Sequence, residues 1–251
     1  NDEYNLLAED SYAITSEGDL LVLGKSCIYK VEDNGDAIDF KPVTKSALDA
    51  FILTPDGYIY LYDPLPSILN YLNLPFEFSY WDLRNQLYGN QKFEYECYAP
   101  DGKFSMLELS LFEDEPFYYL GQWVNQTTST IYLSGLCLED GITIKQISIS
   151  GGQSQQIRDY KSKVQIYSFE ESPFVVIDEH SFYLKGSEKV ISCTFDKRSY
   201  NWRLTEVDNA DQSLLDPKNY DYCFDDGENF YGYKLVDGQI SITKVSSIGI
   251  L

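Results

Sequence analysis

The chain of 251 residues has few positive charges and little histidine, the residue on which many catalytic and metal sites depend. It contains 19 lysines and arginines against 40 aspartates and glutamates, with one histidine and one methionine. The net charge of -21 repels phosphate backbones and anionic lipid surfaces, so it disfavours nucleic acid and membrane partners. We expect a neutral glycan or another protein as the partner instead.

Long apolar runs and the common nucleotide-binding loops are also missing. No run approaches the roughly 20 apolar residues of a transmembrane helix, so we expect no direct membrane insertion. Neither G-x-x-x-x-G-K-[ST] nor G-x-G-x-x-G occurs, which argues against nucleotide binding by these loops. The chain begins with Asn1 and not with Met, which is compatible with removal of an export signal.

The cysteines form no metal or redox motif. There are five, an odd number, and no two are spaced as C-x-x-C. Each lies in a strand-like run, where a thiol serves as a small buried hydrophobe. We therefore expect free, buried thiols at Cys27, Cys97, Cys137, Cys193 and Cys223.

An acid-glycine turn follows an apolar strand four times along the chain. Tyrosine and phenylalanine are abundant, 22 and 14 residues, which favours half-buried strands over helices. Glycine accepts positive φ and the acid caps local amides, so these turns predict tight hairpins. The four segments are 14–18, 53–57, 98–102 and 223–227.

The segments after each turn predict a repeating unit of short antiparallel strands. We expect each turn to join the first and second strands of a unit, with third strands at Cys27–Val31, Ile68–Leu72 and Ile240–Val245. Two units lacking the motif are expected in Pro173–Phe195 and Phe117–Tyr160, and in the latter Glu139-Asp140-Gly141 can join the second and third strands instead. Fourth strands are expected at Ala37–Lys41, Phe76–Trp81 and Trp202–Val207.

Short four-stranded units at a spacing of about 40 residues are typical of a β-propeller. We predict an all-β, six-bladed propeller of four antiparallel strands per blade, with five or seven blades as alternatives, as a single domain over residues 1–251. A strand at residues 4–8 could close the last blade. A β-sandwich would also have many short strands, but it would not keep the turn at a constant phase.

Most residues with chemical potential have a simple structural interpretation. The turn acids are explained by turn chemistry, and His180 is expected to be a solvated turn residue. Paired carboxylates could serve a glycosidase, but among so many acids such pairs arise by chance. We expect no cofactor. Calcium at Glu32–Asp36 or Asp208–Asp211 is a weaker alternative, since neither segment has the spacing of a calcium loop.

The remaining candidate is a binding surface on the connecting loops. Three loops combine aromatic faces with amide and acidic oxygens, the groups that stack on sugars and bond their hydroxyls. We name no catalytic residue and no metal ligand. The candidate ligand-binding residues are Tyr62, Asp63, Arg84, Asn85, Tyr88, Asp208 and Asp211.

Two segments near the C-terminus resemble a known group of proteins. The segment Tyr220–Leu235, YDYCFDDGENFYGYKL, resembles the propeller segment of bacterial extracellular lipoproteins, some of which precede a solute-binding domain of ABC importers. The segment Ser192–Trp202, SCTFDKRSYNW, is similar to a hairpin from the same group. The resemblance implies an exported, surface-anchored bacterial protein, with a further attached domain as one option and no chemistry assigned to the propeller.

These observations favour a non-catalytic extracytoplasmic binding module that serves carbohydrate or nutrient capture. Two alternatives stay open. One is a carbohydrate-active propeller enzyme that uses paired carboxylates. The other is a purely structural docking platform.

Overall fold

The computed structural model is built from β-strands. It describes residues 12–35, 38–69, 88–113, 115–139, 141–164, 166, 174–178, 180–185, 189–208, 222–225, 229–236 and 238–247. These residues form strands β1 to β20, and every pairing between them is antiparallel.

The strands form five sheets in the described part of the chain. The first sheet contains β1 (Tyr12–Ile14), β2 (Leu20–Leu23), β3 (Ile28–Asp33) and β4 (Ile38–Pro42). The second contains β5 (Ala50–Leu53), β6 (Ile59–Tyr62), β8 (Phe93–Tyr98) and β9 (Phe104–Leu109). The third contains β7 (Tyr88–Gly89), β10 (Phe117–Asn125), β11 (Thr130–Cys137), β12 (Ile142–Ser150) and β13 (Gln153–Ser162). The fourth contains β14 (Phe174–Asp178), β15 (Ser181–Lys185), β16 (Lys189–Asp196) and β17 (Asn201–Asp208). The fifth contains β18 (Tyr222–Asp225), β19 (Asn229–Val236) and β20 (Gln239–Ser247).

The first four sheets pack face to face, each on the next, through alternating side chains. On β11, Ile131 and Leu133 belong to the core shared with the second sheet, whereas Leu136 belongs to the core shared with the fourth. This alternation follows from the two-residue period of a strand, and it lets one strand bury both of its faces. A further core joins the first and second sheets through Leu21 and Phe51.

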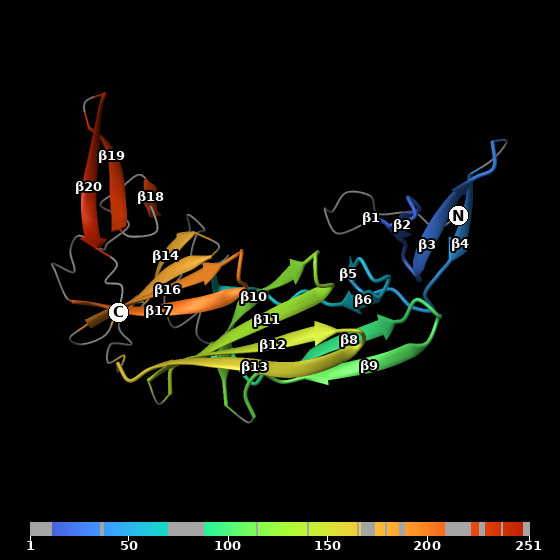
Figure 1. Cartoon of the computed structure of the whole chain (residues 1–251), viewed down its shortest axis with the longest axis horizontal. Helices are drawn as coiled ribbons and strands as arrows, with labels where there is room; N and C mark the ends of the chain where they lie inside the picture. The colour runs from blue at the N-terminus through green and yellow to red at the C-terminus, as the bar shows by residue number, and fades with distance from the viewer. Residues whose placement is uncertain are drawn as a thin grey trace.

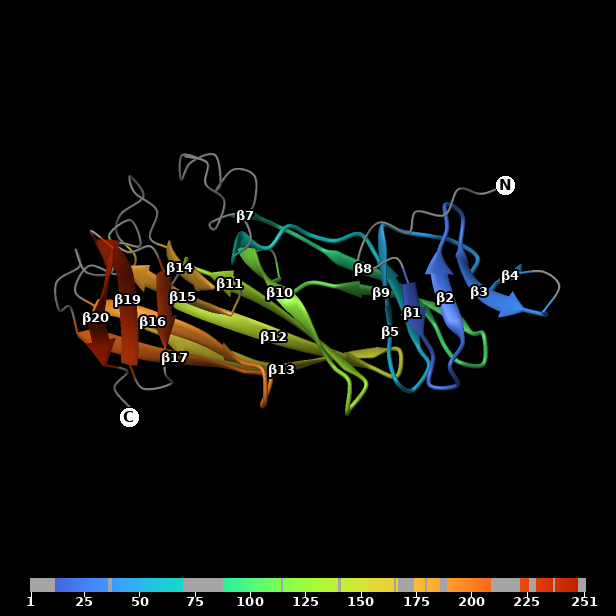
Figure 2. The same cartoon turned by 90° about the horizontal axis from the view of Figure 1, so that it is seen from above.

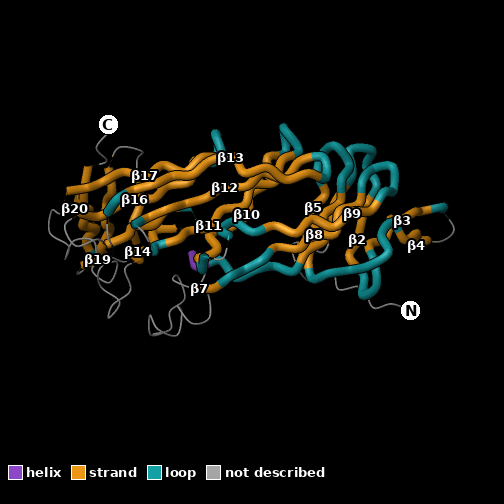
Figure 3. The backbone as a smooth tube through the Cα atoms, turned by 90° about the horizontal axis from the view of Figure 1, so that it is seen from below, coloured by secondary structure: helices purple, strands orange, loops and turns teal. Residues whose placement is uncertain are grey.

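The five sheets succeed one another along the long axis of the molecule (Figure 2). Figure 1 shows that the succession is curved, because the first and fifth sheets lie at opposite ends and rise on the same side of the third sheet. Strands and their connecting loops dominate the backbone trace in Figure 3.

Three of the four acid-glycine turns are tight hairpins, as predicted, but their phase is not constant, and the glycine of the fourth turn, Gly227, lies outside the described residues. The amides of Gly18, Gly57 and Gly102 each donate to the carbonyl three residues before, at 2.9, 2.8 and 2.8 Å, and all three glycines have positive φ. Gly18 and Gly57 join the first and second strands of their sheets, whereas Gly102 joins β8 to β9, the third and fourth strands of the second sheet. The prediction of phase was wrong for Gly102, because the same turn suits any tight antiparallel connection.

The expected third strand at Ile68–Leu72 is also wrong where it is described. Ile68 and Leu69 are helical and buried, and β6 pairs instead with β8, which comes about thirty residues later. Two units that we counted from the turns are therefore one sheet, and the described residues form five sheets instead of six. The expected strand Phe76–Trp81 and the closing strand at residues 4–8 lie outside the described residues.

The units without the motif are confirmed. Residues of Pro173–Phe195 form β14, β15 and β16, and residues of Phe117–Tyr160 form β10 to β13. Gly141 lies between β11 and β12, so this turn joins the second and third strands of the meander that starts at β10. The fourth strands expected at Ala37–Lys41 and Trp202–Val207 correspond to β4 and β17.

Cys27, Cys97, Cys137 and Cys193 are free and buried, as expected from their strand-like surroundings. Cys223 lies on β18, and its side chain is outside the described part of the structure. Within the described residues, no helix is long and apolar enough to cross a membrane.

The hydrogen bond from Trp202 Nε1 to Ser134 Oγ, 3.0 Å, joins the third and fourth sheets inside the core. Ser134→Ala leaves the buried indole N–H unpaired, so we expect the free energy of unfolding to fall by about 1–3 kcal/mol in urea denaturation. Ser134→Ala with Trp202→Phe should cost less than the sum of the single changes. Ser148→Ala on the neighbouring strand is the control, because its exposed hydroxyl is 3.4 Å from its acceptor. Additive losses would contradict this role of the bond.

Candidate functional site

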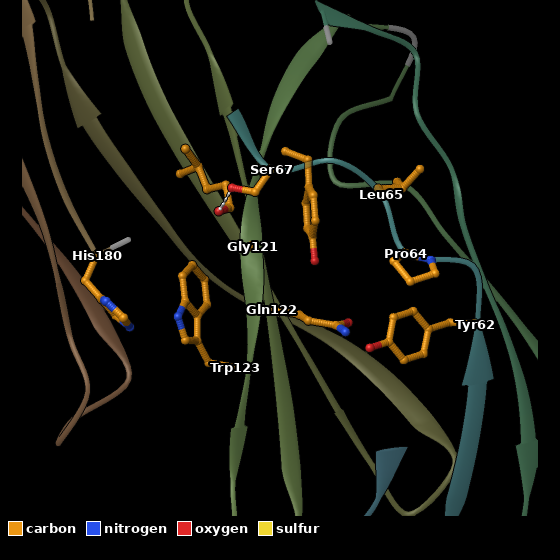
Figure 4. A pocket seen from close by; sticks show the side chains of 10 residues that line it. Tyr62, Pro64, Leu65, Ser67, Gly121, Gln122, Trp123 and His180 are labelled. Carbon is orange, nitrogen blue, oxygen red and sulfur yellow. Dashed lines mark hydrogen bonds between the residues drawn. The ribbon is translucent and has the colours of Figure 1, made fainter. Parts of the chain in front are cut away.

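A pocket of about 370 Å³ lies where the second, third and fourth sheets meet. The end of β6 and the following segment contribute Tyr62, Pro64, Leu65 and Ser67, β10 contributes residues 119–123, and the turn before β15 contributes His180 (Figure 4). None of these lining residues is Asp, Glu, Lys or Arg. The first pocket therefore offers aromatic surface and neutral polar groups.

A β-bulge in β10 sets the direction of the lining side chains. Tyr119 pairs with Gly135 and Gly121 with Ser134, so Leu120 is an extra residue without an opposite partner. Before the bulge, Phe117 and Tyr119 face the second sheet, and after it Trp123 faces the fourth sheet. One extra residue reverses the alternation of a strand. The bulge therefore sends Trp123 toward one wall of the pocket and Gln122 toward the other.

Glycine is required at the bulge. Gly121 has a φ of 152°, which side-chain-bearing residues rarely adopt, and a Cβ placed there would lie 3.1 Å from Cζ2 of Trp123. The indole ring therefore packs over the position that a side chain would occupy.

The wall formed by the fourth sheet is aromatic. The Trp123 ring stacks on Phe195 at 4.0 Å between centroids, and Trp202 meets it edge-on at 5.7 Å. The His180 ring lies 6.4 Å from that of Trp123 and is half-buried. The expectation of a solvated turn histidine was therefore wrong in part, since His180 does lie in a turn but packs against Trp123 and lines the pocket.

The opposite wall carries hydroxyl and amide groups. Tyr95 donates a hydrogen bond of 2.8 Å to Oε1 of Gln122, and Figure 4 shows the Tyr62 hydroxyl and the Gln122 side chain pointing toward one another. Burial raises the pKa of Tyr95 and of Tyr119 well above the ordinary value, with smaller contributions from neighbouring phenols. These hydroxyls therefore stay protonated near neutral pH and can donate hydrogen bonds.

Ser67 attaches the segment after β6 to the bulge. Its hydroxyl donates to the carbonyl of Leu120, the residue that the bulge leaves without an opposite partner, and the bond is drawn in Figure 4. The amide of Leu69 donates in turn to Ser67 Oγ at 3.2 Å. A buried carbonyl is thus satisfied from outside its own sheet, and the bond holds one rim of the pocket in place.

A second pocket of about 290 Å³ adjoins the first and is lined on its far side by β8. The two pockets share Tyr62, Leu65, Tyr119 and Gln122. The second pocket differs in charge, because Asp63, Lys92, Glu94 and Glu96 also line it.

The arrangement suits binding of a small polar molecule. Each pocket has a volume near the lower end of the range for ligand sites, about 300–1,000 Å³. Within the described ranges, no group of three or more His, Cys, Asp or Glu residues could hold a metal ion.

The structure brings together two of the residues singled out from the sequence. Tyr62 and Asp63 line the second pocket, and Tyr62 also lines the first. Tyr88 lies on β7, where its ring packs on Tyr118 at 4.6 Å and its hydroxyl donates to Glu139 at 3.3 Å, and it lines neither of these pockets. The side chain of Asp208, together with Arg84, Asn85 and Asp211, lies outside the described residues.

Sequence reasoning missed the bulge residues, although one signal for them was present. Gly121 interrupts the strand-like run of Phe117–Asn125, and an isolated glycine in a strand often marks a bulge. Ser67 carried no such signal.

No protein-family model matches the sequence, and no curated protein matches it. Among solved structures, a protein from Lactobacillus plantarum aligns with 94% of this chain and 70% of its own, at 12% identity and a TM-score of 0.30. A puromycin-hydrolyzing peptidase from Mycobacterium tuberculosis aligns with 94% of this chain but 37% of its own, at 10% identity and a TM-score of 0.30. A TM-score of 0.30 is too low to support an inference about the fold or function of this chain.

We expect Gly121→Ala to destabilise the protein by about 2–4 kcal/mol, because it combines an unfavourable φ with a clash against Trp123. The control is Gly18→Ala, whose φ of 90° is also positive but whose added Cβ would meet nothing within 4 Å. That variant should lose only about 1–2 kcal/mol. Urea unfolding followed by tryptophan fluorescence measures both, and equal losses would contradict the proposed contact with Trp123.

Proposed function

We propose that the chain is a non-catalytic binding module whose first pocket holds a small neutral polar ligand, with a saccharide unit as the best fit. The observation that carries the proposal is the lining of this pocket, which combines aromatic rings with hydroxyl, amide and imidazole groups and includes no charged carboxylate, lysine or arginine. Sugar rings present apolar C–H faces together with many hydroxyls, and this mixture is complementary to both kinds of group.

Two polar side chains of the first pocket lie where they can form hydrogen bonds with a ligand. Gln122 Oε1 accepts a hydrogen bond from the Tyr95 hydroxyl. This bond fixes the orientation of the amide, so Nε2 of Gln122 is available as a donor to a ligand. The Tyr119 hydroxyl belongs to a side chain that is 5% exposed, and it makes no hydrogen bond within the described part of the chain. Its oxygen is not among the fully buried atoms that lack a partner, so it reaches the pocket, where a hydroxyl of a bound ligand would pair with it.

We also propose an extracytoplasmic location in a bacterial surface protein, with a role in carbohydrate or nutrient capture. This part rests on the resemblance of Tyr220–Leu235 and Ser192–Trp202 to lipoprotein propellers. An attached transport domain belongs to the same proposal. A docking platform without a small ligand would leave the neutral pocket without a role.

Tyr119→Phe tests the pocket with the smallest change. It removes a hydroxyl that makes no hydrogen bond among the described residues, so we expect unchanged or slightly higher thermal stability. Saccharide affinity should fall about 3- to 10-fold for the loss of one hydrogen bond. Calorimetric titration with a panel of neutral mono- and disaccharides measures the affinity.

The matched control is Tyr132→Phe on β11, because Tyr132 stacks on Tyr200 at 5.0 Å and lines neither pocket. It should leave affinity unchanged. Failure of every saccharide in the panel to bind the unaltered protein would contradict the proposal. Turnover of a bound saccharide would favour the enzyme that uses paired carboxylates.

We further infer that the five described sheets are blades of a β-propeller that closes on itself. The first sheet supports this with an apolar row across all four strands, in which Ile14, Leu20, Val31 and Phe40 are register partners in turn; Val31 is half-buried and the other three are exposed. Ile14 is 66% exposed. A sixth blade, as the sequence predicts, would have to involve residues outside the described part.

The fifth sheet has a matching apolar face. Leu235 pairs with Ile240 and Tyr233 with Ile242, and Ile240 is 64% exposed. Each interior contact between sheets is made by two such apolar faces, and the curved succession in Figure 1 raises both end sheets on one side. Contact between the end faces would cover both and would close the ring.

If the first and fifth sheets meet and close the propeller, the protein is a compact particle. Small-angle X-ray scattering should give a radius of gyration of about 18 Å, as for an ordinary compact chain of this length. Ile14→Cys with Ile240→Cys should form an intrachain disulfide under oxidation, whereas Ile14→Cys with Ile157→Cys, on the third sheet, should not. A larger radius together with no intrachain bridge would contradict closure.

A further inference from the structure

The two pockets adjoin one another, and we call them together the cleft, whose two halves differ in chemistry. They share Tyr62, Leu65, Tyr119 and Gln122, so the boundary between them consists of side chains that face both spaces. The first half is lined by neutral groups. The second adds Asp63, Glu94 and Glu96 against one positive charge, on Lys92.

Strand lengths explain why the second half is open. Tyr62, the last residue of β6, pairs with Tyr95 of β8, but β8 begins two residues earlier, at Phe93. Phe93 and Glu94 therefore have a partner on β9 and none on β6. The chain leaves the sheet at Asp63, whose carboxylate accepts a 3.3 Å hydrogen bond from the amide of Asp49.

One carboxylate of this half, that of Glu94, is placed at an energetic cost. Glu94 lies directly opposite Glu108 in the ladder between β8 and β9, and both side chains are exposed. Like charges in direct cross-strand register repel one another. Glu96 is held in place by hydrogen bonds from the hydroxyls of Ser46 and Tyr98. A cation in this half would reduce the repulsion and pair with oriented oxygens.

The Tyr119 hydroxyl is available to a ligand at the boundary. Its side chain is 5% exposed, it lines both halves, and it makes no hydrogen bond with any described residue. Its oxygen is not among the fully buried polar atoms that lack a partner, so it reaches the open space of the cleft, where it can form a hydrogen bond with a polar group of a bound molecule.

We propose that the cleft binds an amino-sugar oligosaccharide, with a neutral part of a sugar ring in the first half and a protonated amine in the second half. The proposal rests on the proposed function of the first half, and it adds that the ligand carries a positive charge in the second half. Tyr119 and Gln122 would contact the ligand at the boundary, and Glu94 and Asp63 would lie beside the amine.

The test compares two disaccharides of the same linkage, one with free, positively charged amines and one in which both amines are acetylated and neutral. The probes are the β-1,4-linked disaccharide of glucosamine and its N,N'-diacetylated counterpart, titrated calorimetrically at neutral pH in low and high salt. We expect the amine form to bind at least about fivefold more tightly at low salt, with the difference shrinking at high salt. Glu94→Gln should reduce that preference about two- to fivefold without changing affinity for the acetylated form.

Glu113→Gln is the matched control, because Glu113 is exposed and lines neither half of the cleft. It should not change the preference. Equal binding of the two disaccharides, or a preference for the amine form that survives Glu94→Gln unchanged, would overturn the inference and leave the proposed function standing. Binding of neither disaccharide, nor of any neutral saccharide, would overturn both.

Discussion

The bulge at Leu120 and Gly121 is the constraint on which the cleft depends. A regular β10 would direct residues 121 and 123 to the face of Phe117 and Tyr119, and Gln122 to the opposite face. The extra residue exchanges these directions, so that Trp123 packs on the fourth sheet and Gln122 holds Tyr95 of the second. The bulge at these two residues thus connects three sheets, because the side chains that it directs all line the first pocket or contact residues that do.

The consequences of the bulge extend beyond β10. Its unpaired carbonyl at Leu120 is satisfied by Ser67, which fixes the segment after β6 as the rim of the pocket. The stack of Trp123 on Phe195 continues to Trp202, whose indole nitrogen reaches Ser134 on the next strand of the third sheet. The site is therefore held by the packing between sheets, and burial raises the pKa of its Tyr95 and Tyr119 hydroxyls above the ordinary value.

Much of the fold could be predicted from the sequence because strands have a short, local signal. The alternation in Pro173–Phe195 identified β14 to β16 even without a turn motif. The order of strands in the second sheet could not be predicted in the same way. The partner of β6 comes about thirty residues later, and the apolar run at Ile68 and Leu69 has the composition of a strand although its residues are helical. Composition cannot separate a buried strand from a buried helical turn over so few residues.

The cleft was less predictable than the fold, because its residues meet only through packing between sheets. Tyr62 and Asp63 were found from their loop composition, whereas Ser67 and His180 depend on neighbours far along the chain. The sequence marks Gly121 as unusual, but it does not tell which face each neighbouring side chain takes after the bulge. That direction comes from the pairing of Gly121 with Ser134.

Ligand binding at the bulge is measured most directly by titrating the nitrogen-15-labelled protein with a saccharide that binds to it. The tryptophan indole N–H signals are followed by NMR. Trp123 borders the pocket, whereas Trp202 is buried and donates its indole proton to Ser134, so Trp202 serves as an internal reference. We predict a saturable shift of the Trp123 signal with little change at Trp202. A Trp123 signal that does not move while the saccharide binds would contradict it.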